Sequence, residues 1–288
     1  MPTLARRSLR LLASAVWWTT MSLAVGSAAA VGMSRSQVIR GAGALAALPL
    51  GIEIYSRAPP KWKSSSLPLL TQQHDSRASE LVLVLPGAGG PDANSKRIAQ
   101  ALSSPSAIVV EYNWQAFCGD TLRAPYNAQR VGRHLGSVIA QEQRARPTLR
   151  RVHLVGISVG AFVADAAVTA YTLCVPREDR AGIRLTFLDP FTARGIAGLG
   201  WPETAYGVSS FGVSADEAVC VLNTDDPVPS TSTPLRHCAN YDVTAARSRA
   251  AFEPLPGDSL HSWPCAWFGL VGGELPTAVP RGAVLQVP

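Results

Sequence analysis

The segment 156–160 reads Gly-Ile-Ser-Val-Gly and places Ser158 between two glycines. An apolar run, 152–155, precedes it and a segment with helical spacing, 160–172, follows it. Ser158 is therefore expected at a sharp turn between a buried strand and a helix. A serine in such a turn takes a strained backbone conformation, and side chains two residues to either side would collide with neighbouring backbone. This pattern predicts that Ser158 is a catalytic nucleophile.

A glycine-rich loop, Pro86-Gly87-Ala88-Gly89-Gly90, follows the first apolar run of the expected domain. A nucleophile that attacks a carbonyl needs backbone N–H groups aimed at the negative oxygen that forms, and a loop after an early strand can supply one of them. The amides of Ala88 and Val159 are predicted to form this oxyanion hole. The loop lacks the G-x-G-x-x-G spacing and the downstream acidic residue of a dinucleotide site, so no such cofactor is expected.

Five histidines are candidates for the general base: His74, His134, His153, His237 and His261. In hydrolases with this type of turn the catalytic residues run serine, acid, histidine along the chain, so the base should lie near the C-terminus. That order leaves His237 and His261. His261 is preferred because it opens an apolar segment of helical character after the turn-forming residues 256–258. His153, inside the strand before Ser158, is predicted to be a core histidine.

Two strand ends could supply the carboxylate that orients this histidine. Asp189 ends the run 183–188, whereas Asp225 and Asp226 follow the next run, 218–222. Either can project a carboxylate toward the histidine, because sites in α/β sheets form at the carboxyl ends of the strands. An Asp-Asp-Pro turn needs no catalytic role, since aspartate favours turns and proline presets them. Asp189 is the preferred acid, and Asp225 or Asp226 is the alternative.

Five short apolar runs alternate with segments of helical spacing. Such alternation predicts a mostly parallel sheet with crossover helices, and runs that are apolar throughout predict strands covered on both faces. The expected fold is an α/β-hydrolase fold, with a mostly parallel central sheet, helices on both faces and a nucleophile elbow at Ser158. The predicted strands are 81–85, 107–112, 151–155, 183–188 and 218–222, and the predicted helices are 92–103, 126–146 and 160–172.

Residues 81–191 resemble the family of pancreatic-type lipases and their phospholipase relatives. The resemblance rests on Val110-Glu111-Tyr112-Asn113-Trp114, on Pro125-Tyr126-Asn127-Ala128, on the elbow at 152–161 and on Leu188-Asp189-Pro190. Ile157 and Pro86 stand where that family has histidines. The resemblance implies an α/β-hydrolase fold, hydrolysis of carboxylic esters including lipids, and Asp189 as the acid.

The net charge of +6 does not indicate a face for binding anions. Residues 1–52 contain five arginines and no acidic residue, whereas 53–288 are close to neutral, with 21 basic and 20 acidic side chains. A nucleic-acid partner is therefore not expected. The five cysteines show no metal-ligand spacing, and Cys220, in an apolar run, is predicted to be buried. No metal and no organic cofactor is expected.

The N-terminal residues have the composition of a targeting segment. A charge-free stretch, 11–33, follows Arg6, Arg7 and Arg10, which suits a signal peptide or a membrane anchor. A second apolar patch, 41–52, leaves plastid targeting by a bipartite presequence as the alternative. The chain is predicted to comprise a leader over 1–56, a linker over 57–77 and a hydrolase domain over 78–288, at a membrane or in the secretory pathway.

Together these residues predict a serine hydrolase that cleaves the carboxylic ester of a small molecule or lipid through an acyl-enzyme intermediate. Ser158 attacks, His261 takes and returns the proton, and Asp189 orients the imidazole. An acyltransferase or a thioesterase would use the same residues. A membrane-tethered binding protein with a hydrolase-like fold and no turnover is the alternative from another class. Four aromatic residues could line an acyl pocket or belong to the core: Trp201, Phe211, Trp263 and Trp267.

Overall fold

The computed structural model describes residues 51–60, 67, 78–195, 205–254, 259–275 and 279–288. The chain divides into two compact units, Met1–Tyr55 and Ser56–Pro288. In the first unit, residues 51–55 are helical. Of the helices formed by described residues, none has the length and apolar character needed to cross a membrane. The charge-free stretch at 11–33 lies outside the described residues, and the leader, linker and domain boundaries stay predictions.

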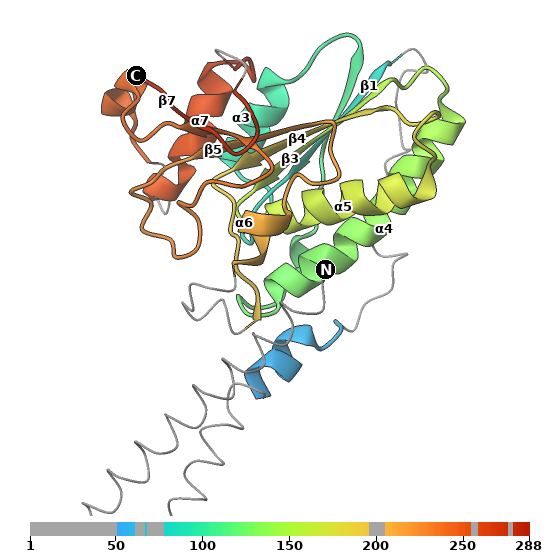
Figure 1. Ribbon diagram of the computed structural model, residues 1–288, viewed down its shortest axis with the longest axis horizontal. Coiled ribbons are helices and arrows are strands. Elements are labelled where there is room, and N and C mark those ends of the chain that lie inside the picture. Colours follow the sequence, from blue (N-terminus) through green and yellow to red (C-terminus); the bar gives the residue numbers. More distant parts are fainter. Residues whose placement is uncertain (1–50, 61–66, 68–77, 196–204, 255–258, 276–278) are drawn as a thin grey trace, which may run out of the picture. The chain divides into compact units, whose positions relative to one another are not determined.

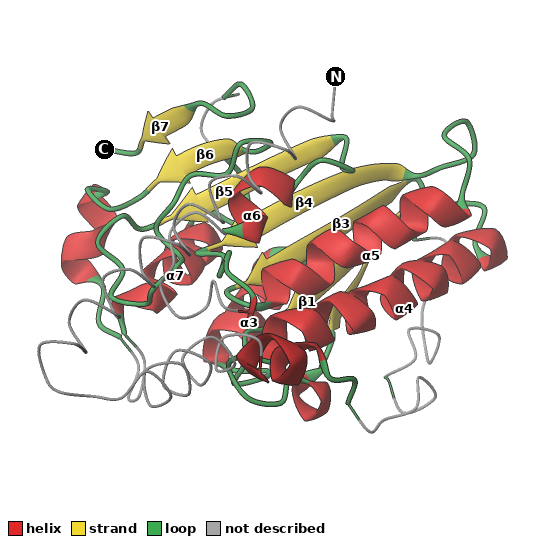
Figure 2. Ribbon diagram, turned by 60° about the horizontal axis from the view of Figure 1, so that its bottom comes forward, coloured by secondary structure: helices red, strands yellow, loops and turns green. Residues whose placement is uncertain are grey.

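The second unit is built on a seven-stranded sheet in which each neighbouring pair of strands is parallel. The strand order across the sheet is β2-β1-β3-β4-β5-β6-β7, and Figure 2 shows most of these strands side by side. The strands are β1 (Glu80–Leu85), β2 (Ala107–Glu111), β3 (Arg151–Ile157), β4 (Gly182–Leu188), β5 (Glu217–Leu222), β6 (Ala239–Asp242) and β7 (Val284–Gln286).

Helices cover both faces of this sheet (Figures 1 and 2). α4 (Ala124–Ala145) and α5 (Gly160–Cys174) pack together on one face, and α3 (Ala93–Ala101) and α7 (Trp263–Leu270) pack together on the other. Successive strand residues point to opposite faces, so that Leu83 belongs to the buried cluster under α5, and Val84 belongs to the one under α7. Burial on both faces is the reason why the central strands are apolar throughout.

Local signals in the sequence explain where two of the helices begin. Asp92 caps α3, because its Oδ1 accepts a hydrogen bond from the amide of Ser95 at 2.7 Å while the Ser95 hydroxyl accepts one from the amide of Asp92 at 2.9 Å. Such a reciprocal pair satisfies two of the N–H groups that a helix start leaves unbonded. α4 has Pro125 in its first turn, where the missing N–H costs nothing.

The order of the strands determines where along the sheet a site is expected. From β1 the chain passes to β2 on one side and then returns to β3 on the other side of β1. Ligands of open α/β sheets bind outside the carboxyl ends of the strands at such a switch point. The loop after β1 and the turn after β3 therefore meet at the expected place for a site.

The fold class predicted from the sequence is confirmed: the domain has an α/β-hydrolase fold. All five predicted strands and all three predicted helices are present, with ends that differ by up to two residues. β6 and β7 were not predicted from the sequence. Both are short, with four and three residues, and β6 carries the polar side chains of Asn240 and Asp242.

Candidate active site

Ser158 occupies a tight turn between β3 and α5. Its φ angle is +50°, a conformation that non-glycine residues rarely adopt and that is typical of functional sites. A Cβ atom at Gly156 would lie 2.7 Å from Cα of Ala161, and one at Gly160 would lie 2.2 Å from the carbonyl oxygen of Leu85. Both flanking positions therefore require glycine. Ser158 itself is partly exposed.

The glycine-rich loop after β1 lies directly against this serine. A Cβ atom at Gly87 would be 3.4 Å from Cβ of Ser158 and 4.0 Å from its Oγ. Fully buried Trp114 supports the loop, because its Nε1 donates a hydrogen bond to the carbonyl oxygen of Pro86 at 2.9 Å. Within the described part of the chain, the structure records no hydrogen bond from the amide of Ala88 or Val159. Val159 also caps the N-terminus of the 15-residue helix α5, where the helix dipole favours negative charge.

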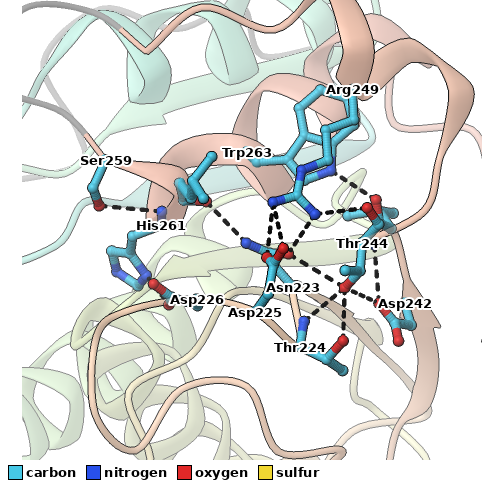
Figure 3. A network of polar contacts seen from close by, with 12 residues as sticks. Asn223, Thr224, Asp225, Asp226, Asp242, Thr244, Arg249, Ser259, His261 and Trp263 are labelled. Atoms are coloured by element: carbon cyan, nitrogen blue, oxygen red, sulfur yellow. Dashed lines mark hydrogen bonds and ion pairs between the residues drawn. The ribbon is translucent and has the colours of Figure 1, made fainter.

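His261 faces two carboxylates from the ends of neighbouring strands. Its Nδ1 lies 2.6 Å from Oδ2 of Asp226 and 3.2 Å from Oδ2 of Asp189. The histidine sits in the short turn Leu260–Ser262, where the hydroxyl of Ser259 accepts a hydrogen bond from its amide at 3.2 Å. With Nδ1 held in this way, Nε2 is the nitrogen left for chemistry. Figure 3 shows the ring turned toward Asp226.

Asp189 is adjacent to the serine turn through main-chain hydrogen bonds. The amide of Ser158 donates to the carbonyl oxygen of Leu188 at 3.1 Å, and the amide of Phe191 donates to the carbonyl oxygen of Ser158 at 3.1 Å. Asp189 has a φ of +43° and is 1% exposed. Two of the three described non-glycine residues with positive φ are therefore predicted site residues, Ser158 and Asp189.

The two aspartates of the loop after β5 point to different partners. Asp226 faces His261, and its Oδ2 also accepts a hydrogen bond from the hydroxyl of Thr231 at 2.5 Å. Both carboxylate oxygens of Asp225 instead lie 2.8 Å from Nη2 of Arg249. The structure thus brings Asp226, but not Asp225, to the histidine together with Asp189.

The electrostatics of the cluster follow from burial and from these short contacts. Burial disfavours the charged imidazole, but the hydrogen bonds and negative charges of Asp189 and Asp226 outweigh it and raise the pKa of His261 to about 9. Burial is the main cause that raises the pKa of Asp189 to about 7. Burial also opposes ionisation of Asp226, but hydrogen bonds from His261, Asp189 and Thr231 outweigh this and lower its pKa to about 2.

Asn223, directly after β5, joins the histidine turn to the strand ends (Figure 3). Its Nδ2 donates to the carbonyl oxygen of Leu260 at 3.2 Å, and its amide donates to Oδ1 of Asp189 at 3.4 Å. Its Oδ1 accepts from Oγ1 of Thr244 and Nη1 of Arg249, both at 3.3 Å. Asn223 was not predicted as a site residue; its position at the carboxyl end of a predicted strand was the available signal.

The other described histidines lie in different surroundings. His153 is 2% exposed, and its Nε2 is 2.9 Å from the hydroxyl of Thr186. Burial lowers the pKa of His153 to about 3, so the prediction of a core histidine is confirmed. His237, two residues before β6, contacts the carbonyl oxygen of Ser209 at 3.2 Å. It therefore lies at the amino end of that strand, whereas Ser158 follows the carboxyl end of β3. His134 is in α4, and His74 lies outside the described residues.

Three of the four aromatic residues proposed for an acyl pocket belong to the core. Phe211 and Trp263 are completely buried and Trp267 is 4% exposed. Nε1 of Trp263 donates to the carbonyl oxygen of Val243 at 2.8 Å. Trp201 lies outside the described residues. Cys220 is completely buried as predicted, and the five cysteines are free thiols.

A cavity of about 660 Å³ opens at the amino ends of the strands, opposite to the end where Ser158 lies. It lies at the amino ends of β4, β5 and β6, and its lining includes Arg184, Glu217 and Tyr241. Ser158 and His261 are not among the lining residues. This cavity is therefore not the place where a molecule would meet the serine.

The cluster of His261, Asp189 and Asp226 has the residue types of a metal site, with one ligand atom from each within 4.8 Å of the others. Zinc ligands sit about 2.0–2.2 Å from the ion in a tetrahedral arrangement, which separates them from one another by about 3.4 Å. The 2.6 Å between His261 and Asp226 is shorter than that and is typical of a charge-assisted hydrogen bond. The geometry therefore fits an oriented imidazole better than an ion.

Comparisons with known proteins leave the family of this chain open. No protein-family model matches the sequence, and no curated protein matches it. One similar solved structure is that of a candidate carboxylesterase of Lactobacillus plantarum, with 17% identity and a TM-score of 0.37. The match covers 70% of this chain and 88% of that protein. At this level of likeness no activity is transferred from that protein to this one.

Proposed function

We propose that this protein is a serine hydrolase that cleaves a carboxylic ester through an acyl-enzyme intermediate. The observation that carries the proposal is the histidine held through Nδ1 by two carboxylates, 2.6 and 3.2 Å away. This histidine lies at the carboxyl ends of the strands, as does Ser158 in its strained strand-to-helix turn. A nucleophile, a base and an orienting acid in this chain order are the parts that acyl transfer requires.

In the proposed mechanism, Oγ of Ser158 attacks the carbonyl carbon of the ester while Nε2 of His261 takes its proton. The amides of Ala88 and Val159 donate hydrogen bonds to the oxyanion that forms. When the tetrahedral intermediate collapses, the C–O bond to the alcohol breaks and the alcohol leaves with the proton from His261. Water then attacks the acyl-serine with His261 as the base, which releases the acid and restores the Ser158 hydroxyl.

The substrate we propose is an ester with a hydrophobic acyl group. The resemblance of residues 81–191 to pancreatic-type lipases supports this choice. We also propose that the charge-free, arginine-preceded stretch at 11–33 targets the chain to a membrane or to the secretory pathway, where lipid esters are accessible. Cleavage of a thioester, or transfer of the acyl group to an acceptor other than water, would use the same three side chains. The experiment below therefore compares substrates and acceptors.

The acyl-enzyme makes a prediction about product ratios. Two butyrate esters with different leaving alcohols pass through the same acyl-serine, so added methanol should capture the same fraction of acyl groups from both. Formation of methyl butyrate and butyric acid is measured by chromatography over a range of methanol concentrations. A capture ratio that changes with the leaving alcohol would contradict a common intermediate, and absence of turnover on oxygen esters and thioesters would contradict the proposed function.

A further inference from the structure

Two carboxylates lie beside Nδ1 of His261, whereas a single N–H group at that nitrogen needs only one acceptor. Nδ1 of a neutral imidazole carries one hydrogen, and Oδ2 atoms of both Asp226 and Asp189 lie within 3.2 Å of it. One carboxylate oxygen of each aspartate and one ring nitrogen of His261 lie within 4.8 Å of one another. Two carboxylates this close to one another do not both ionise readily, as in other sites where two acids share one proton.

The surroundings of the two carboxylates are unequal. Oδ2 of Asp226 accepts a hydrogen bond from Thr231 at 2.5 Å, and its Oδ1 accepts one from the amide of Val228 at 3.0 Å. Besides His261, the donor to Asp189 that the structure records among the described residues is the amide of Asn223, at a longer 3.4 Å. Hydrogen bonds to a carboxylate favour its ionised form, so Asp226 is the better place for the negative charge and Asp189 is the better place for a proton.

We propose that Asp226 is the carboxylate that orients His261, and that Asp189 is held as a neutral acid that shares its proton with Asp226. This inference rests on the proposed function for its consequences in catalysis, but the protonation pattern itself is a property of the resting protein. The two carboxyl groups shift each other in opposite directions, since Asp226 raises the pKa of Asp189 and Asp189 lowers that of Asp226.

The arrangement has a consequence for the base. As the pH rises, Asp189 loses its proton first, and the second negative charge then holds a proton on His261. The imidazole must be neutral to act as a base, so kcat/KM should rise with pH up to about 9, the value to which the two carboxylates raise the pKa of His261. The other charged groups of the neighbourhood are paired: Asp225 with Arg249, and Asp242 with Thr244 and Gln286.

The test replaces each carboxylate of the full-length protein by its neutral isostere. Asp189→Asn keeps a neutral hydrogen-bonding group beside Asp226, so the maximal kcat/KM should fall by less than about tenfold, whereas Asp226→Asn should lower it by about 10³-fold, because the imidazole loses its orienting charge. Asp189→Asn should also lower the proton affinity of His261 by about tenfold, moving the acid limb of the pH profile to lower pH.

Two further variants keep the test decisive. Thr231→Val removes a hydrogen-bond donor to Asp226 and should lower kcat/KM in the same direction as Asp226→Asn. This variant tests the role of Asp226 even if Asp226→Asn does not fold. Asp225→Asn breaks only the contact with Arg249 and should leave the titration of His261 unchanged. Loss of activity in Asp189→Asn with retention in Asp226→Asn, or equal losses in both, would overturn the proposal.

A readout without turnover separates this inference from the proposed function. The protonation of Asp189 itself is followed by NMR of the carboxyl carbon in the wild-type protein and in Asp226→Asn. If the Asp189 carboxyl group titrates near pH 7 in the wild-type protein and at lower pH in Asp226→Asn, the shared proton is supported even for a protein that hydrolyses no ester. If Asp189 titrates in the ordinary range of aspartate in the wild-type protein, the shared proton is excluded even for an active esterase.

Discussion

Replacement of Ser158 by alanine is expected to lower kcat for a short-chain aryl ester by about 10⁴-fold or more. The substitution removes the atom that forms the acyl bond, and the residual rate comes from the oxyanion hole and binding alone. The backbone should tolerate the change, since alanine at a φ of +50° has the same Cβ as the serine it replaces. The measurement is the initial rate of p-nitrophenyl butyrate hydrolysis.

A matched control for this substitution is Ser214→Ala, which removes an exposed hydroxyl that contacts Thr169 at 3.2 Å. Surface changes of this kind alter stability by less than about 0.5 kcal/mol, so its rate should equal that of the wild-type protein. Turnover by Ser158→Ala close to the wild-type rate would exclude Ser158 as the nucleophile.

The second large effect is expected for the histidine. His261→Ala should lower kcat by about 10⁴-fold or more, because the serine loses its base and the leaving alcohol loses its proton donor. His237→Ala should keep full activity, since His237 lies near the amino end of β6 and contacts the carbonyl oxygen of Ser209. The same ester assay measures both variants, and thermal unfolding checks that both are folded.

Equal activity of the two histidine variants would contradict the assignment of the base. A loss of activity in His237→Ala alone would place the site at the amino ends of the strands, where the cavity lined by Arg184 and Glu217 opens. Because the two histidines belong to opposite ends of the strands, this pair of variants tests the location of the site as well as the identity of the base.

The central sheet was predictable because its strands are covered on both faces. Residues such as Leu83 and Val84 are completely buried on opposite faces, and only an apolar run satisfies that condition over several residues. β6 and β7 lie toward the edge of the sheet and are too short for a hydrophobic pattern. Asn240, in β6, uses its side chain for hydrogen bonds to the backbone of Leu235, Cys238 and Ala283, so it does not resemble a strand residue.

The candidate site was predictable to the extent that it depends on local sequence and chain order. Ser158 was proposed from its two glycines, and His261 was proposed from its place after the acids. The sequence could not decide between Asp189 and the pair Asp225 and Asp226, because adjacent residues in a turn point to different partners. The structure directs Asp225 to Arg249 and places both Asp226 and Asp189 on the same nitrogen of His261.

Asn223 and the sharing of His261 by two acids depend on contacts between segments far apart in the chain. Asn223 lies 37 residues from Leu260, whose carbonyl it binds, and Asp189 lies 72 residues from His261. Neither pairing has a spacing or a composition that a single sequence displays. The physical reason is that the two strand ends and the histidine turn come together only when the sheet is complete.

The central claim is that Ser158 is an activated nucleophile, and labelling with a fluorophosphonate tests it most directly. The reagent phosphonylates a serine hydroxyl only where a base and oxyanion donors assist the attack. The full-length protein is treated with the reagent, digested and examined by mass spectrometry. One label on the peptide that contains Ser158, lost on His261→Ala and unaffected by His237→Ala, is the predicted result. A protein that stays unlabelled, or that carries its label on another residue, would contradict the account.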